Sequence, residues 1–348
     1  MTGLVMKKCL SLLTWFYLFS ACAVFAAQDA RDSDSPFGVL DFLSWDHEWN
    51  HGHYNGDKVE KAAGLMKEAG VAFVRMDFLW SDIEPVKGTF EFKKYDLIVE
   101  ILSKKGIKIL GLLDYNASWS SAHWNDAPNR EYYIQFAEQV VKRYKDKIKY
   151  WEIWNEPDCK LYWAPQDDMK SYTCLLKEVY PVLKKVDPTC DVLLGGLSQN
   201  IPIQLRRIYE YGGRNFFDIV NIHPFADPGS ANAMQMLKGI YLGVYKQMKE
   251  NGDAEKPIWF TELGCPGVCN PKEKGWWFGE SPLEEKQAKW VETVYGEPLR
   301  WKGVKKIFWA FFRDTPNHFK NGVDYFGLVR EDFSKKLGFE SYKKAARR

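Results

Sequence analysis

Short apolar runs alternate with longer segments of helical periodicity along most of the chain. The runs have the length of buried strands and contain many β-branched and aromatic residues. We expect eight strands, at residues 37–42, 72–78, 108–113, 150–155, 192–197, 218–223, 257–262 and 306–311. The segments between them are long enough to hold helices.

Two of these segments carry clear helix signals. Between Met169 and Val186 the apolar residues recur at steps of three and four, which predicts a helix with one apolar face. A second helix is expected to open at Ser281-Pro282-Leu283-Glu284, because serine is a good N-cap, proline suits the first turn and glutamate completes a capping box.

Eight strand–helix units predict an α/β fold, a single-domain (β/α)8 TIM barrel over residues 37–348. The nearly continuous apolar strands suit a parallel sheet that is buried on both faces. A doubly wound open sheet is the alternative, but no glycine-rich phosphate turn follows the first strand. The 37 residues that follow position 311 are too few for a second domain such as a β-sandwich, so we expect a single domain.

Aromatic and imidazole side chains gather at one predicted face. In a (β/α)8 barrel, ligands bind where the carboxyl ends of the strands and the following loops meet. All six histidines and ten of the fourteen tryptophans after residue 27 fall in those positions. We therefore expect the recognition site at this face.

Two glutamates stand at the ends of predicted strands. Glu156 follows the fourth strand in Trp151-Glu152-Ile153-Trp154-Asn155-Glu156-Pro157, and Glu262 ends the seventh in Thr261-Glu262-Leu263-Gly264. Both carboxylates should reach the same rim of the barrel. Such a pair can perform retaining glycoside hydrolysis, in which one group protonates the leaving oxygen and the other attacks the anomeric carbon.

These motifs resemble those of the clan A retaining glycoside hydrolases. The resemblance extends to Arg75, to Trp80 with Glu84-Pro85, and to Phe326-Gly327-Leu328-Val329 near the end of the chain. Within the clan, the chain is most similar to glycoside hydrolase family 39 and related bacterial endoglycosidases.

The resemblance implies roles for individual residues. Glu156 would be the general acid/base and Glu262 the nucleophile, while Asn155 would bind the 2-hydroxyl of the sugar. Arg75 would lower the pKa of Glu262, since a guanidinium favours a nearby carboxylate. Trp309 would form the floor of the cleavage subsite. The further substrate-binding candidates are His223, Trp80 and Trp276.

One position departs from the family pattern. Many clan members carry a tyrosine two residues after the histidine of strand six, and its hydroxyl binds the nucleophile. Here that residue is Phe225, and Tyr115 is the possible substitute.

Two further groups have competing interpretations. Glu152 shares its strand face with Glu156, and we interpret it as a buried carboxylate neutralised by a cation rather than as a catalytic group. His47, His51 and His53, with Asp46 and Glu48, could hold a metal ion, but loop histidines that contact sugar hydroxyls are the favoured interpretation. No metal or cofactor is expected.

The first 27 residues have the pattern of a signal peptide. Lys7 and Lys8 precede an apolar run from Leu10 to Ala26, and alanines suit cleavage after Ala26. We expect an exported protein, periplasmic or extracellular, with a short polar linker at 28–36. An uncleaved anchor and lipidation at Cys22 are the alternatives.

Five cysteines follow this segment, an odd number that leaves at least one free thiol. Cys265 and Cys269 could close a small ring, Cys159 and Cys174 could form a second bond, and Cys190 is expected to be a buried thiol.

Charge and composition limit the partners. The chain has 48 basic and 46 acidic residues, and removing Lys7 and Lys8 makes the two numbers equal. This balance argues against a nucleic-acid partner, and no membrane-spanning domain is expected after signal cleavage. The expected partner is a carbohydrate, although the residues select no single sugar, linkage or oligomeric state.

Two functions fit this sequence. The first is a retaining glycosidase that acts on a polysaccharide or oligosaccharide, where the long 263–280 stretch with Trp276 favours a cleft and endo action. The second is a carbohydrate-binding barrel that has lost catalysis, such as a surface lectin or a component of glycan uptake.

Overall fold

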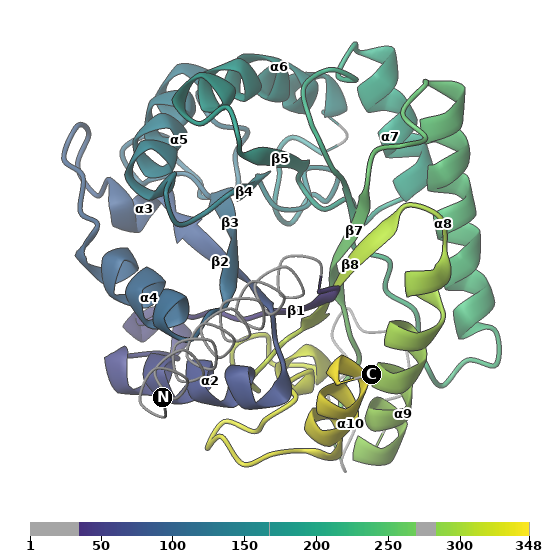
Figure 1. The fold of residues 1–348 in the computed structure, drawn as a ribbon. Coiled ribbons are helices and arrows are strands. Elements are labelled where there is room, and N and C mark those ends of the chain that lie inside the picture. The colour runs from purple at the N-terminus through teal and green to yellow at the C-terminus, as the bar shows by residue number, and fades with distance from the viewer. Residues whose placement is uncertain (1–34, 167, 269–282, 348) are drawn as a thin grey trace, which may run out of the picture. The chain divides into compact units, whose positions relative to one another are not determined.

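Eight parallel strands form the ring that the apolar runs predict (Figure 1). The computed structural model describes residues 35–166, 168–268 and 283–347. The strands are β1 (Phe37–Leu40), β2 (Phe73–Leu79), β3 (Lys108–Asp114), β4 (Tyr150–Ile153), β5 (Asp191–Leu194), β6 (Val220–Ile222), β7 (Ile258–Leu263) and β8 (Val304–Ala310). Their order is β5-β4-β3-β2-β1-β8-β7-β6, and two isolated parallel bridges join β5 to β6. The (β/α)8 barrel is confirmed, and the open sheet is wrong.

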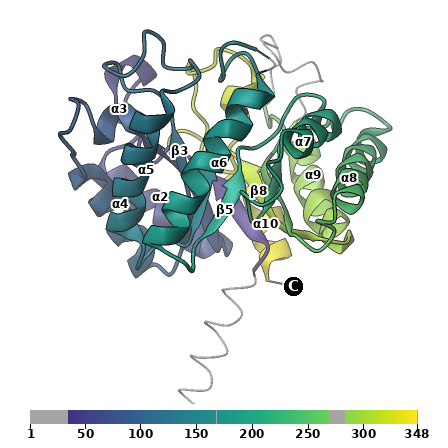
Figure 2. The ribbon, with the colours of Figure 1, turned by 90° about the horizontal axis from the view of Figure 1, so that it is seen from above.

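Helices surround this ring (Figures 1 and 2). They are α2 (Gly56–Ala69), α3 (Trp80–Ile83), α4 (Lys93–Lys104), α5 (Arg130–Tyr144), α6 (Met169–Val186), α7 (Ile201–Glu210), α8 (Ala233–Glu250), α9 (Glu284–Gly296) and α10 (Leu337–Ala346), with short 3-10 turns at Glu48–Asn50, Pro298–Arg300 and Gly322–Tyr325. The predicted 169–186 helix is confirmed as α6, whose apolar face is buried. Among the described residues, no helix is long and apolar enough to cross a membrane.

The start of α9 differs from the prediction. The helix begins at Glu284, with Leu283 as its N-cap, while Ser281 and Pro282 lie outside the described residues. The Glu284 carboxylate pairs with Arg330 and accepts a hydrogen bond from the first backbone N–H of α10, at Leu337 (3.3 Å). The ion pair with the guanidinium is the stronger of these two contacts, because both of its partners are charged.

An aromatic layer closes the lower part of the barrel. The rings of Phe73, Tyr150, Trp259 and Phe308 pack together inside it, with Trp259 5.8 Å from Phe308 and 5.9 Å from Phe73 between ring centroids. Side chains alternate along a strand, so the next inward residue after Phe73 is Arg75. The aromatic layer therefore forms a dry base on which the polar residues of the site are placed.

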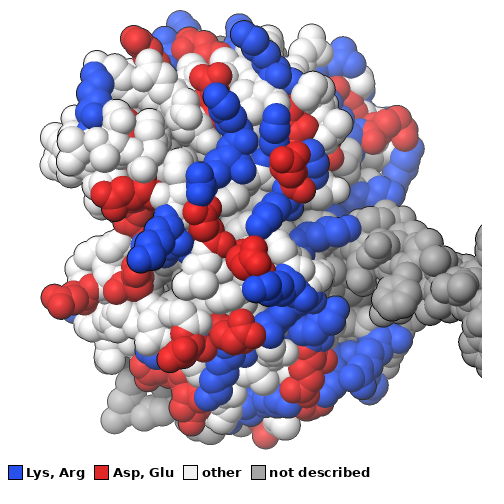
Figure 3. All heavy atoms as spheres, turned by 60° about the vertical axis from the view of Figure 1, so that its left-hand side comes forward, with Lys and Arg blue, Asp and Glu red and all other residues white. Residues whose placement is uncertain are grey.

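The outer surface mixes both signs of charge. On the face shown in Figure 3, basic and acidic side chains are interspersed. Ion pairs join α4 to α5 and to the turn that follows it, as in Arg143 to Asp96 and Lys147 to Glu100 (3.2 Å). Exposed pairs of this kind contribute little to stability.

The cysteines described by the structure are free thiols. They include Cys159 and Cys174, so the expected bond between these two is wrong. Cys159 is held beside the site, where its backbone N–H donates to Glu156 O (2.9 Å). Cys190 is buried, as expected. The expected ring with Cys265 involves Cys269, which lies outside the described residues.

Candidate active site

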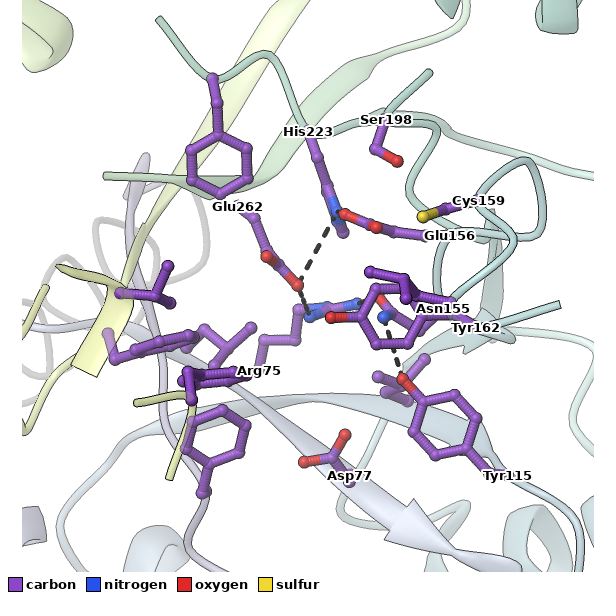
Figure 4. Close-up of a pocket in the computed structure, with 18 of the residues that line it drawn as sticks. Arg75, Asp77, Tyr115, Asn155, Glu156, Cys159, Tyr162, Ser198, His223 and Glu262 are labelled. Atoms are coloured by element: carbon purple, nitrogen blue, oxygen red, sulfur yellow. Dashed lines mark hydrogen bonds and ion pairs between the residues drawn. The ribbon is translucent and has the colours of Figure 1, made fainter. Parts of the chain in front are cut away.

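A pocket of about 290 Å³ lies at the carboxyl ends of the strands (Figure 4). The structure brings six of the residues singled out from the sequence to its walls: Arg75, Tyr115, Asn155, Glu156, His223 and Glu262. They come from β2, β7 and the segments that follow β3, β4 and β6. Residues distant in the sequence therefore converge on one cavity.

The backbone around Glu156 is strained. Trp154 has a φ of 65° and Glu156 a φ of 44°, both in the left-handed region, which costs a residue with a side chain roughly 1–2 kcal/mol. Burial of the Trp154 ring and a hydrogen bond from its Nε1 to Tyr162 O (2.8 Å) hold this turn. Strain of this kind persists where the surrounding structure imposes it, and here it directs Glu156 into the pocket.

The two carboxyl groups face each other. One oxygen of Glu156, one oxygen of Glu262 and Nδ1 of His223 all lie within 4.8 Å of one another. His223 Nδ1 is 2.8 Å from Glu156 and 3.7 Å from Glu262. The arrangement places two acids and an imidazole around a space where a reacting carbon could sit.

Arg75 organises the base of the pocket. Its Nε and Nη2 donate to the two oxygens of Glu152 (2.7 and 2.9 Å), Nη1 donates to Glu262 (2.7 Å), and Nη2 also reaches Asn155 Oδ1 (2.9 Å). All of these groups lie inside the barrel mouth (Figure 4 labels Arg75, Asn155 and Glu262). The interpretation of Glu152 as a buried carboxylate neutralised by a cation is confirmed.

Burial changes the acidity of both carboxyl groups in the same direction. It raises the pKa of Glu156 to about 7. It also raises the pKa of Glu262, although the adjacent Arg75 opposes the rise. Arg75 does lower the pKa of Glu262, as expected, but the loss of hydration outweighs one guanidinium that is shared with Glu152, so the net shift is upward.

A chain of hydrogen bonds fixes the protonation of His223. Asn221 Nδ2 donates to Leu194 O (3.0 Å), so Asn221 Oδ1 accepts from the Thr261 hydroxyl (2.7 Å). Since that hydroxyl has donated its one proton, Thr261 Oγ1 can only accept from His223 Nε2 (3.0 Å). Burial lowers the pKa of His223 to about 4, and its neutral ring therefore has no proton on Nδ1. The hydrogen between Nδ1 and Glu156 then belongs to the carboxyl group of Glu156.

A glycine makes room for this histidine. A Cβ atom on Gly196 would lie 1.9 Å from His223 Nε2, a distance no pair of such atoms tolerates. The Gly196 backbone N–H also donates to Glu152 (3.0 Å). The absence of a side chain at this position allows β5 and the imidazole to approach each other.

Asn155 and Tyr115 form a second pair at the pocket wall. Asn155 Oδ1 faces the Arg75 guanidinium, so its amide nitrogen points outward and donates to the Tyr115 hydroxyl (2.9 Å). Tyr115 was the possible substitute for the tyrosine whose hydroxyl binds the nucleophile in many clan members. Its hydroxyl instead binds Asn155, so it does not take that place beside Glu262. The second proton of the Asn155 amide group is available to a ligand.

Two predicted sugar-binding tryptophans are core residues. Trp309 is fully buried, donates from Nε1 to Phe326 O (2.8 Å) and does not line the pocket. Side chains alternate along β8, and Phe308 points into the barrel, so Trp309 points outward to the helical layer. Trp80 is also buried, with its Nε1 bound to Glu84 (2.7 Å). Trp276 lies outside the described residues.

Two residues of the pocket were not expected from the sequence. Asp77 lines it and accepts from Trp45 Nε1 (2.9 Å), and Tyr162 lines it as well. Asp77 was detectable, because it shares its strand face with Arg75. Tyr162 comes from a loop and gave no periodic signal. His318, one of the histidines expected at this face, also lines the pocket.

The residues considered as an alternative metal cluster do not all come together. His47 binds Asp82 (2.7 Å) and lies near Asp46, but His51 and His53 do not join this group. The Lys94 ammonium pairs with both aspartates there and supplies the positive charge. Glu156, His223 and Glu262 are close enough to share an ion, but the guanidinium on Glu262 opposes a cation.

Comparisons with known proteins point to glycosidases. A family profile described as beta-galactosidase, glycoside hydrolase family 42, matches residues 48–112. Beta-galactosidase BgaA of Clostridium cellulovorans is 42% identical over 59 residues, which are 17% of this chain and 9% of that protein. Beta-galactosidase BbgII of Bifidobacterium bifidum is 26% identical over 174 residues, covering 40% of this chain and 25% of the relative.

Solved structures match nearly the whole barrel. A family 39 glycoside hydrolase from Bacteroides cellulosilyticus has a TM-score of 0.72 and 25% identity, covering 90% of this chain and 64% of that one. A beta-xylosidase from Caulobacter crescentus has a TM-score of 0.68 at 17% identity, covering 89% and 67%, which shows a shared fold. The chain is therefore similar to glycoside hydrolase barrels, those of family 39 among them, and it spans only 9% and 25% of the length of the two curated relatives named above.

Proposed function

We propose that the chain is a retaining glycosidase that cleaves O-glycosidic bonds of a polysaccharide or oligosaccharide by double displacement. Glu156 acts as the acid/base and Glu262 as the nucleophile. The observation that carries this proposal is the separation of the two carboxyl groups, whose oxygens lie within 4.8 Å. Retaining enzymes hold these groups about 5–5.5 Å apart, whereas inverting enzymes leave roughly 6.5–9.5 Å for a water molecule.

The first step uses the unequal surroundings of the two acids. A Glu262 oxygen attacks the anomeric carbon, and the bond to the leaving oxygen breaks as Glu156 donates its proton to that oxygen. Glu156 holds this proton because His223 presents a lone pair to it. The pKa of Glu156, raised by burial to about 7, supports an acid that keeps its proton up to neutral pH.

The second step reverses the role of Glu156. After proton transfer, its carboxylate faces the lone pair on His223 Nδ1 across 2.8 Å. The carboxylate and the Nδ1 lone pair are both acceptors, and they repel each other at this distance. This repulsion makes the carboxylate a stronger base, which takes a proton from an incoming water. The water oxygen bonds to the anomeric carbon, and Glu262 departs as a carboxylate that Arg75 stabilises.

The remaining contacts orient the sugar. The free amide proton of Asn155 is placed to bind the 2-hydroxyl, a contact that strengthens as positive charge develops on the ring. Phe311 and Phe225 add apolar surface to the pocket. The similarity to a beta-galactosidase and to a beta-xylosidase favours β-galactosides and β-xylosides as the first substrates to test.

Replacement of Glu262 tests the assignment. Glu262→Gln should abolish hydrolysis of an aryl β-galactoside or β-xyloside while leaving sugar binding nearly intact. Glu255→Gln is the matched control, because Glu255 is an exposed acid paired with Lys302. An active Glu262→Gln protein would refute the nucleophile, and NMR detection of an inverted first product would refute the retaining mechanism.

A separate experiment tests the acid/base. Glu156→Ala should remain able to form the glycosyl-enzyme from a substrate with a good leaving group, and added azide should then restore turnover as a glycosyl azide. If azide gives no rescue in a protein that still binds sugar, Glu156 is not the acid/base.

The rival function is a carbohydrate-binding barrel without catalysis. Both carboxyl groups, Arg75 and the His223 chain are assembled, and this supports the enzyme. A screen of the wild-type protein against a panel of polysaccharides separates the two. Binding without release of reducing ends across the panel would favour the binding protein.

We further propose that residues 1–27 direct export and are removed. The support is the charged and apolar pattern of this segment. Determination of the N-terminus of the protein recovered outside the cytoplasm tests the cleavage site. A Cys22→Ser variant that loses a lipid label would instead establish the lipid-anchored alternative.

A further inference from the structure

A second cavity opens beside the catalytic pocket. It measures about 600 Å³ and shares Trp45, Tyr115, Leu161, Tyr162, His318 and Phe319 with the pocket, so the two are continuous. Tyr115 and Tyr162 form part of this shared wall (Figure 4). We call this second cavity the aromatic groove. Its outer edges carry Trp49 and Trp124.

These two tryptophans are exposed to an unusual degree. Trp49 is 67% exposed and Trp124 is 52% exposed, although an indole ring gains free energy by leaving water. They differ in this from Trp80 and Trp309, which are fully buried and anchor the fold. Their exposed ring faces therefore do not contribute to the core and are available to a ligand.

The exposed rings are nevertheless held in place. Trp49 lies against His47 (5.3 Å between ring centroids) and Trp45 (5.4 Å), and His47 is fixed by Asp82 (2.7 Å). The backbone N–H of Asn116, which follows β3, donates to the backbone carbonyl of Trp124 (2.9 Å) and so holds Trp124 near the end of that strand. Trp124 also packs edge-on to Tyr115 (4.8 Å). Rings that are ordered before binding lose little entropy when a ligand arrives.

The lining of the aromatic groove indicates a neutral ligand. Among the described residues that line it, none is Asp, Glu, Lys or Arg. Burial lowers the pKa of His318 to about 4, so its ring is neutral at physiological pH. Ser81, Asn116 and the Tyr115 hydroxyl supply polar atoms among the apolar walls. Apolar faces with a few hydroxyl and amide groups match an uncharged sugar ring, which has C–H faces and a hydroxyl rim.

From these observations we propose that the aromatic groove is a further sugar subsite. It binds an uncharged sugar unit of the same chain whose glycosidic bond is cleaved in the pocket, with Trp49 and Trp124 as its stacking surfaces. The inference rests on the proposed glycosidase function and extends it, because it assigns the surface that holds a second sugar unit and makes that unit uncharged.

The test compares short and long substrates. An aryl β-galactoside and an aryl β-xyloside occupy the cleavage site alone, whereas β-1,4-linked galacto- and xylo-oligosaccharides of increasing length also reach the aromatic groove. Trp49→Ala and Trp124→Ala should each lower kcat/KM on the long chains by about tenfold and leave the aryl glycosides nearly unchanged. Trp49→Tyr, which keeps a ring face, should recover much of the loss.

A control variant outside both cavities separates a loss of sugar binding from a general loss of activity. Tyr211→Ala removes an exposed aromatic side chain that does not line either cavity, and it should change neither substrate class. Equal effects of the tryptophan variants on long and short substrates would overturn the subsite. So would a gain with chain length that was as large for charged oligogalacturonates.

Binding separates this inference from the catalytic proposal. Tryptophan fluorescence of the Glu262→Gln protein is titrated with the same oligosaccharides. A wild-type protein that cleaves nothing, while its titration depends on Trp49 and Trp124, would overturn the catalytic proposal and keep the subsite. A titration unaffected by both replacements, or no response at all, would overturn the subsite.

Discussion

If the proposed mechanism holds, the hydrogen-bond chain behind His223 makes Thr261 a positioning residue that sets the protonation of Glu156 without touching the sugar. Replacing Thr261 by Val keeps the shape of the side chain but removes the hydroxyl that accepts from His223 Nε2. The buried Nε2–H then has no acceptor, which costs about 1–3 kcal/mol. The imidazole can avoid this cost by moving its proton to Nδ1, where it faces Glu156.

The size of the effect follows from that change of tautomer. A proton on Nδ1 donates to the Glu156 carboxylate, and a hydrogen bond to a charged acceptor is worth about 1.5–3 kcal/mol. Since one pKa unit corresponds to about 1.4 kcal/mol, the pKa of Glu156 should fall by roughly one to two units. In the native protein burial raises this pKa to about 7. The acid would then lose its proton at a mildly acidic pH.

The assay is the pH dependence of kcat/KM on a glycoside with a poor leaving group, where protonation by Glu156 matters most. Activity depends on protonated Glu156, so the alkaline limb of the profile should move to lower pH by the same one to two units in Thr261→Val. Thr261→Ser keeps the hydroxyl and should restore the native limb. Thermal unfolding checks that both variants fold. A folded Thr261→Val protein with the native alkaline limb would refute the tautomer argument.

Three further changes test other parts of the site. In Gly196→Ala the new methyl group should displace His223. A shift of about 1 Å should lower kcat on an aryl glycoside by the order of a hundredfold. An unchanged kcat would show that the site tolerates the displacement. Glu152→Gln removes a negative charge that raises the pKa of both Glu156 and Glu262, so both limbs of the pH–rate profile should move to lower pH, and an unchanged profile would contradict this. Trp309→Phe should lower the melting temperature through loss of about 1 kcal/mol while leaving KM unchanged, and a raised KM would return Trp309 to the pocket.

Much of the fold was predictable because each strand is a local apolar pattern. The runs near residues 72–78 and 257–262 mark β2 and β7 almost to the residue. The weakest element is β6, which is three residues long and joins β5 through isolated bridges. A side chain of β6 adds to this pairing, since Asn221 Nδ2 donates to the backbone carbonyl of Leu194 in β5, and such contacts leave no trace in hydropathy.

The site was predictable where strand ends carry rare polar residues. Glu156 and Glu262 were found by position, and the strand count brought them to one rim. The proton chain was not found, because Asn221 and Thr261 are ordinary polar residues until three strands are placed side by side. Trp309 was misplaced by a one-residue error of strand face, since alternation reverses the direction of a side chain with each residue.

The charge at the base of the pocket explains why protonation must be controlled so closely. Among the described residues lining the pocket, Arg75 is the one guanidinium or ammonium group, and it faces both Glu152 and Glu262. A third ionised carboxylate beside them would add repulsion in a buried site, and this favours a Glu156 that keeps its proton in the proposed mechanism until the leaving oxygen takes it. In that mechanism the remaining ionised groups are negative in excess, and this excess would stabilise the positive charge that develops on the sugar ring in the transition state.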